Sequence, residues 1–157
     1  MTKYNKSILI IGVLVVVLTG GLITRVYSHC QIPCGIYDDG ARLKAIAEHI
    51  TTIEKSMNQI NELSTADAKN MNQIVRWVNN KDNHADELAD IVTYYFMAQR
   101  IKPTGQDSAN YKKYVEQLTL LHEMLVTSMK CKQTTDLENV EKLKNLLHEF
   151  SHAYTEK

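Results

Sequence analysis

Residues 43–63, LKAIAEHITTIEKSMNQINEL, carry the pattern that decides the fold. Apolar side chains recur there at steps of three and four, which is the spacing of one face of an α-helix. The positions are Leu43, Ile46, Ile50, Ile53, Met57, Ile60 and Leu63. The segment therefore predicts a long amphipathic helix with one buried face.

Three further stretches repeat this spacing downstream. The first carries Met71, Ile74, Val78, Leu88, Ile91 and Tyr95, the second Tyr111, Tyr114, Leu118, Leu121 and Leu125, and the third Leu137, Val140, Leu143, Leu147, Phe150 and Tyr154. Glycine and proline are sparse beyond Cys34, which disfavours a β fold because such a fold needs many turns. Four amphipathic helices with short connections predict an all-α fold, an antiparallel four-helix bundle over residues 38–157.

Polar residues mark the expected helix ends. Ser64 with Asp67 has the form of a capping pair that opens the second helix. That helix is expected to bend or break in the polar stretch 79–84, and residues 102–105, Lys-Pro-Thr-Gly, predict a turn. The expected caps of the last two helices are Asp107 or Ser108, and Thr134, Thr135 or Asp136.

The charge balance limits the class of partner. The 157 residues hold 18 basic and 18 acidic side chains. Residues 1–28 contain three of the basic side chains and none of the acidic ones, so the rest of the chain has a net charge of −3. This balance argues against a nucleic-acid partner, which calls for a basic face. Attraction of an anion depends instead on a local positive electrostatic field. Arg42 and Lys44 are candidates to supply it, although both also fit the pattern of solvent-exposed helix residues.

Residues 1–28 have the layout of a secretory signal peptide. Two lysines precede an apolar run over residues 8–23, and Val26 and Ser28 fit the −3 and −1 positions of a cut before His29. The apolar run is somewhat short of the roughly 20 residues that span a membrane. We therefore expect cleavage by a signal peptidase or maturation protease and export to the periplasm or the cell exterior. A retained membrane anchor is the alternative, and this leader is the chain's one expected membrane contact.

Residues 29–37, His-Cys-Gln-Ile-Pro-Cys-Gly-Ile-Tyr, directly follow this leader. A cut before His29 frees an α-amine beside an imidazole and the thiols of Cys30 and Cys34. The amine, the backbone amide of Cys30 and two thiolates make a square-planar nitrogen and sulfur set. Such a set suits Ni(II) or Cu(II) and does not suit Zn(II).

This stretch resembles the nickel hook of nickel-containing superoxide dismutases, whose pattern is His-Cys-x-x-Pro-Cys-Gly-x-Tyr at the mature N-terminus. The resemblance implies that His29, Cys30 and Cys34 bind one nickel ion per subunit and that Tyr37 gates access to it. It implies an enzyme that converts superoxide into oxygen and hydrogen peroxide by Ni(III)/Ni(II) cycling. It further implies a homo-hexamer of four-helix bundles.

Other positions of the segment fit this interpretation. Pro33 fixes φ and helps the chain turn back toward Cys30, while Gly35 allows close backbone approach or an unusual φ. Tyr37 either places its hydroxyl near the open axial face or packs the hook against the bundle. Gln31 stands where many family members have an acidic residue. This difference matters little, because the position contributes mainly its backbone to the hook.

The residues that orient the His29 imidazole are left open. Some members of the family orient this imidazole with a glutamate of the first helix and an arginine of a neighbouring subunit. The corresponding region here has Lys44 and Ala45, with Glu48 a turn later.

The residues leave two other functions open. Residues 148–152, His-Glu-Phe-Ser-His, form an HExxH motif, in which His148 and His152 could bind zinc with Glu149 as the base of a hydrolase. The helical pattern, however, places His148 at the margin of the core and His152 outward. The other alternative is a membrane-tethered helical adaptor with a disulfide between Cys30 and Cys34.

One further cysteine and three further histidines are assigned no function. Cys131 is left unpaired and is expected to be a small buried or half-buried side chain. His49, His84 and His122 are expected at the surface or at the margin of the core.

Overall fold

The computed structural model describes residues 35–68 and 70–155. The chain divides into two units, Met1–Cys34 and Gly35–Lys157, and the described residues belong to the second. The expected leader and hook residues 29–34 lie outside the described part, so the domain boundaries predicted there stay predictions. Within the described residues, none of the helices has the length and apolar character needed to cross a membrane.

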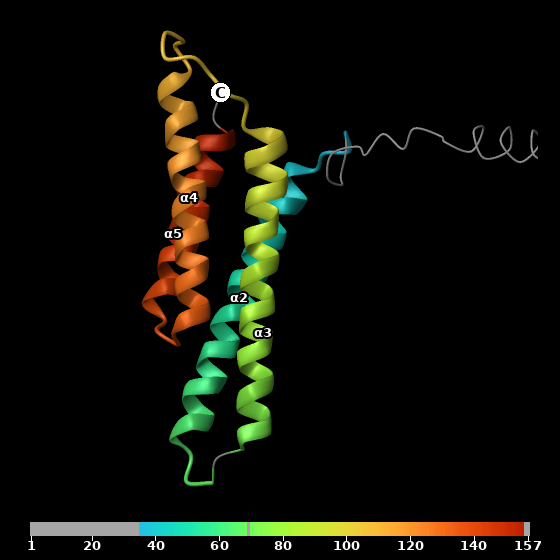
Figure 1. Cartoon of the computed structure of the whole chain (residues 1–157), viewed down its shortest axis with the longest axis vertical. Coiled ribbons are helices and arrows are strands. Elements are labelled where there is room, and N and C mark those ends of the chain that lie inside the picture. The colour runs from blue at the N-terminus through green and yellow to red at the C-terminus, as the bar shows by residue number, and fades with distance from the viewer. Residues whose placement is uncertain (1–34, 69, 156–157) are drawn as a thin grey trace, which may run out of the picture. The chain divides into compact units, whose positions relative to one another are not determined.

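All regular structure in the described part is helical. Its elements are α2 (Asp39–Thr65), α3 (Met71–Asp90), the π-helical η1 (Ile91–Arg100), α4 (Tyr111–Gln133) and α5 (Glu138–Thr155). Because η1 continues α3 directly, the elements form four helical rods that alternate in direction (Figure 1). α2 and α4 each pack on both α3 and α5. This arrangement confirms the predicted antiparallel four-helix bundle.

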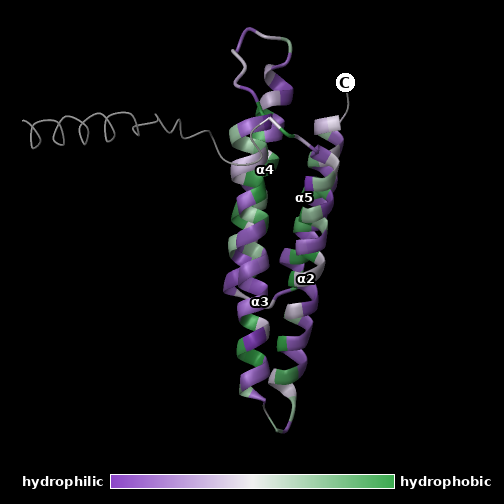
Figure 2. Ribbon diagram, turned by 90° about the vertical axis from the view of Figure 1, so that its right-hand side faces the viewer, coloured by the Kyte–Doolittle hydropathy of each residue, from purple (hydrophilic) through white to green (hydrophobic). Residues whose placement is uncertain are grey.

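The predicted apolar faces meet in one core. Figure 2 shows apolar positions recurring between polar ones along each helix. The fully buried apolar side chains are Ile46, Ile53, Met57, Ala85, Leu88, Val92, Phe96, Leu121, Met124, Cys131, Val140, Leu143 and Phe150. Cys131 is thus buried, as expected, and burial raises the pKa of its thiol to about 11. A thiol with so high a pKa stays protonated and unreactive at neutral pH.

One end of the α2–α3 hairpin extends past the connection between α4 and α5 (Figure 1). Asn61, near the end of α2, donates to the carbonyl oxygen of Thr135 in that connection at 3.2 Å. Beyond this point Met71 is 60 % and Val75 is 52 % exposed. The prediction that Met71 belongs to the buried face is therefore wrong, because α4 and α5 end before they reach its turn.

Two predicted helix boundaries are also wrong. α2 runs through Ser64 to Thr65, so α3 is capped by Asn70, whose side chain accepts from the Gln73 amide at 3.2 Å. α3 is continuous through residues 79–84, and the irregular segment comes later, at η1. A polar stretch in the middle of α3 is tolerated because Lys81, which is buried, finds hydrogen-bond partners.

The later boundaries are closer to the prediction. No helix spans residues 101–110, which contain the predicted turn. The N-cap residue of α4 is Asn110, not Asp107 or Ser108, although the Ser108 hydroxyl accepts from the Asn110 amide at 3.2 Å. At α5 the carboxylate of Asp136 accepts from the Glu138 amide at 3.0 Å, as one of the predicted caps.

Lys81 joins α3 to the end of α4. Its side chain is 3 % exposed, and its ammonium donates to the carbonyl oxygens of Cys131 and Lys132, both at 2.6 Å. It also pairs with the Asp82 carboxylate at 2.8 Å. The two carbonyls belong to the last turn of α4, where carbonyl groups lack partners within the helix. One buried cation therefore satisfies a helix C-terminus.

We expect Lys81→Met to lower the free energy of unfolding by about 1–3 kcal/mol, because it leaves buried carbonyls without a donor. Urea unfolding followed by circular dichroism measures this loss. The matched control is Lys132→Met, which breaks an ion pair to Asp86 whose side chains are 27 % and 60 % exposed. An exposed pair of this kind contributes less than about 1 kcal/mol. Equal losses in the two variants would contradict the role given to Lys81.

Candidate functional site

The structure describes the base of the predicted hook. Gly35, Ile36 and Tyr37 are described, whereas the predicted ligands His29, Cys30 and Cys34 lie outside the described residues. Gly35 has a φ of +79°, a backbone conformation that residues with a side chain rarely adopt. No described atom lies within 4 Å of the place a Cβ would take, so the backbone angle and not space favours glycine. This confirms the unusual φ predicted there.

Tyr37 packs the hook base on the bundle. Its ring meets the ring of Tyr95 edge to face, with centroids 6.0 Å apart. The guanidinium carbon of Arg100 lies 4.4 Å from the centroid of the Tyr37 ring, within the range of a cation–π contact. The residue is 43 % exposed, so one side of it faces solvent. Packing, one of the two predicted roles, is therefore observed, and gating by the hydroxyl stays a prediction.

Next to Tyr37 lies a hydrogen-bonded group that we call the Asp39 junction; it consists of Asp39, Tyr95, Arg100 and Tyr154. Arg100 binds both carboxylate oxygens, with Nε 2.8 Å from Oδ1 and Nη2 2.7 Å from Oδ2. The Tyr95 hydroxyl donates to Oδ1 at 2.6 Å and the Tyr154 hydroxyl to Oδ2 at 2.8 Å. The junction thus ties α2, η1 and α5 together where residues 35–37 enter the bundle.

The π-helical turns of η1 make this junction possible. The Ile101 amide donates to the Phe96 carbonyl five residues back, at 2.9 Å. This looser winding reduces the rotation between residues five apart, which brings Tyr95 and Arg100 nearer to the same side. In an α-helix with 3.6 residues per turn, Arg100 would be rotated by about 140° from Tyr95. Both side chains reach Asp39 because the helix is wound more loosely here.

The charges of the junction are fixed at neutral pH. The Arg100 hydrogen bond outweighs desolvation and lowers the pKa of Asp39 to about 2. Asp39 also lies in the first turn of α2, where the helix dipole favours an anion. Burial first, and the hydrogen bond to Asp39 second, raise the pKa of Tyr95 to about 12. These groups therefore act as an anchor and not as a source of protons.

Of the two cations predicted to attract an anion, Arg42 contacts Tyr95, the residue on which Tyr37 packs. Its guanidinium carbon is 5.3 Å from the centroid of the Tyr95 ring. Lys44 is well exposed and pairs with Glu48 at 3.8 Å, one helical turn along α2. Arg42 is consequently the better placed of the two.

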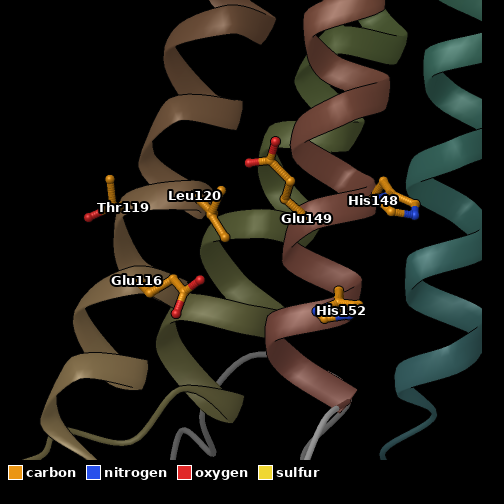
Figure 3. A pocket seen from close by; sticks show the side chains of 6 residues that line it. All are labelled: Glu116, Thr119, Leu120, His148, Glu149 and His152. Atoms are coloured by element: carbon orange, nitrogen blue, oxygen red, sulfur yellow. The ribbon is translucent and has the colours of Figure 1, made fainter.

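The HExxH residues do not form a closed ligand set. His148, Glu149 and His152 line a surface pocket with Glu116, Thr119 and Leu120 of α4. Figure 3 shows Glu149 directed toward α4 and His148 directed away from it. Across residues 35–68 and 70–155, three ligand-type atoms converge at one place only, which is elsewhere. The described residues therefore supply no third zinc ligand to this motif.

Sequence analysis did not identify the Asp39 junction. It placed Tyr95 and Tyr154 on apolar core faces and gave Arg100 no role. The hydrogen-bonded partners of Asp39 are 56, 61 and 115 positions away in the chain, so no local sequence motif could predict them. The one available signal was the presence of tyrosines, which need a hydroxyl partner when buried.

Comparison with known protein families gives a match to the family model described as nickel-containing superoxide dismutase. The match covers residues 24–157. This range includes the complete hook motif over residues 29–37 and all the described helices. No curated relative and no solved structure matches the chain.

The Asp39 junction predicts a pH-dependent contribution to stability. The pKa of Asp39 is lower in the folded chain than its ordinary 3.8, so its contribution is complete above about pH 4 and is lost as the pH falls toward 2. We expect Asp39→Asn to reduce the free energy of unfolding by about 2 kcal/mol at pH 7. The difference from wild type should shrink between pH 4 and pH 2, as measured by thermal or urea unfolding.

Asp38→Asn is the matched control for this prediction. The Asp38 carboxylate caps α2 by accepting from the Ala41 amide at 2.9 Å, and asparagine caps a helix equally well. This variant should differ little from wild type at any pH. A stability loss in Asp39→Asn that does not change with pH would refute the ion-pair interpretation.

Proposed function

The chain belongs to the nickel-containing superoxide dismutase family, and on that premise we propose that residues 29–37 form its metal-binding hook. The enzyme is an oxidoreductase with a nickel cofactor that converts two superoxide anions and two protons into oxygen and hydrogen peroxide. The observation that carries the proposal is the family match from residue 24 onward, because it takes in the complete hook sequence.

The donor chemistry of the hook fits nickel. His29 offers an α-amine and an imidazole, and Cys30 offers a backbone amide and a thiolate, with a second thiolate from Cys34. These are the nitrogen and sulfur donors that suit a square-planar ion. When bound, nickel would supply the one-electron chemistry, as Ni(III)/Ni(II) cycling made accessible by thiolates and an anionic amide. Zinc in the same place has no redox chemistry.

The bundle supplies a fixed base for this hook. Gly35 has a φ of +79°, and Tyr37 is held against Tyr95 and Arg100. Because Arg100 is itself held by Asp39 through two hydrogen bonds, the Tyr37 ring packs on a fixed partner. We propose that the Tyr37 hydroxyl orders the incoming anion or water and limits access of larger ligands.

Cleavage before His29 is part of this proposal. The amine of His29 exists only after residues 1–28 are removed, by a signal peptidase or a maturation protease. The enzyme then acts as an exported protein in the periplasm or outside the cell. A chain that keeps its leader would be anchored in the membrane and would lack the amine donor.

Assembly into a homo-hexamer is likewise proposed. The resemblance implies it, and the uncovered end of the α2–α3 hairpin supports it. Met71 and Val75 expose apolar surface there, beyond the reach of α4 and α5. Apolar surface of this kind favours contact with another copy of the chain.

Neither alternative function is supported. A zinc hydrolase needs a ligand set that the described residues do not provide at His148 and His152. An adaptor with a Cys30–Cys34 disulfide does not account for membership in a family of redox metalloenzymes.

The free amine of His29 gives the first test of the proposal. Protein beginning at His29 and loaded with nickel should catalyse rapid superoxide decay in pulse radiolysis. Protein beginning at Ser28 should not, because a peptide bond then replaces the amine donor. Activity in both samples would remove the amine from the ligand set. Absence of activity in both, with nickel bound and the bundle folded, would overturn the hook proposal.

The Tyr37 hydroxyl gives a second test. Tyr37→Phe keeps the ring contacts with Tyr95 and Arg100, so its unfolding midpoint should match that of wild type. Superoxide turnover should fall roughly tenfold, since a hydrogen bond to an anion is worth about 1.5 kcal/mol or more. Tyr37→Leu, which also loses the ring contacts, should be less stable as well as less active. Wild-type turnover in Tyr37→Phe would leave the residue with packing alone.

A further inference from the structure

Two histidines that the hook does not use face each other across the interface of α2 and α3. Nδ1 of His49 lies 2.8 Å from Nδ1 of His84, and the ring centroids are 5.1 Å apart. Oε2 of Glu87, one turn after His84, lies 3.3 Å from the His49 nitrogen and 3.5 Å from the His84 nitrogen. Within the described residues this is the one place where three such donor atoms converge.

The separations of these atoms approach those of a metal's ligands. Zinc binds imidazole nitrogen and carboxylate oxygen at about 2.0–2.2 Å in tetrahedral geometry, which places neighbouring ligand atoms about 3.3 Å apart. The two distances from Glu87 already match this value. The distance between the nitrogens is shorter by about half an ångström, as in a hydrogen bond between two imidazoles. Small side-chain rotations would separate the two nitrogens enough for a cation to take the place of the proton between them.

The surroundings favour the neutral imidazoles that bind a metal. Desolvation is the largest cause that lowers the pKa of His49, and the neighbouring His84 lowers it further, while Glu87 and Glu48 raise it. The side chains of His49, His84 and Glu87 are 17 %, 29 % and 59 % exposed. Exposure to solvent therefore increases from His49 to Glu87, and a water molecule can reach the three side chains as a fourth ligand.

We propose that His49, His84 and Glu87 bind one Zn(II) ion that clamps α2 to α3. Two imidazoles and one carboxylate are a common zinc ligand set, with water in the fourth position. The hook offers a different set, of thiolate sulfur and backbone nitrogen, that suits nickel. The two sites thus select different ions by ligand type, and the zinc site does not depend on the dismutase reaction.

The test measures zinc binding in a full-length mature chain that carries Cys30→Ser and Cys34→Ser, so that hook thiolates do not compete. A chromophoric chelator competes for zinc, and elemental analysis after gel filtration gives the stoichiometry. We expect one zinc per chain and a rise in the unfolding midpoint when zinc is added. His84→Ala and Glu87→Gln should weaken binding by at least the 10–100-fold that the loss of an outer-shell partner costs.

His148→Ala is the matched control, because His148 and His152 on α5 are the rival pair of histidines. This variant should keep the zinc and the raised midpoint. Zinc retained in His84→Ala but lost in His148→Ala would overturn the proposal, as would a folded parent chain that binds no zinc. Because Glu87 is 59 % exposed, Glu87→Gln should fold normally. If a histidine variant does not fold, zinc binding by Glu87→Gln as tight as in the parent chain would overturn the proposal.

Discussion

The carboxylate of Asp39 holds together the end of the bundle that residues 35–37 enter. It accepts hydrogen bonds from Arg100 and Tyr95 of η1 and from Tyr154 of α5. Arg100 in turn lies against the ring of Tyr37. A residue in the first turn of α2 thereby determines how two other helices and the hook base are arranged.

Ring contacts carry this arrangement into the core. Tyr37 meets Tyr95, Tyr95 meets Phe96, and Phe96 meets Phe150, each pair edge to face with centroids 5.0–6.0 Å apart. Phe96 and Phe150 are fully buried. Because protein cores are closely packed, a change of volume at Phe96 is felt along this row of rings. The orientation of the hook base is therefore a property of the whole bundle and not of a surface loop.

The parts of this structure that could be predicted from the sequence are those encoded locally. Steps of three and four residues predicted the helices, since periodicity needs no knowledge of partners, and the hook motif is contiguous. The continuity of α3 could not be predicted, because it depends on a buried Lys81 whose acceptors lie some 50 positions away. The π-helical winding of η1 and the pairing of His49 with His84 likewise depend on contacts between helices.

The Asp39 junction also bears on the electrostatics of a reaction that consumes an anion and protons. Asp39 and Tyr95 titrate far from neutral pH, so protons must come from elsewhere. The charge of Arg100 is balanced by Asp39 through two short hydrogen bonds, which weakens its field at a distance. The guanidinium carbon of Arg42 lies 5.3 Å from the centroid of the Tyr95 ring, within the range of a cation–π contact. Arg100 therefore serves to hold Tyr37 in place, whereas the attraction of an anion by Arg42 stays a prediction.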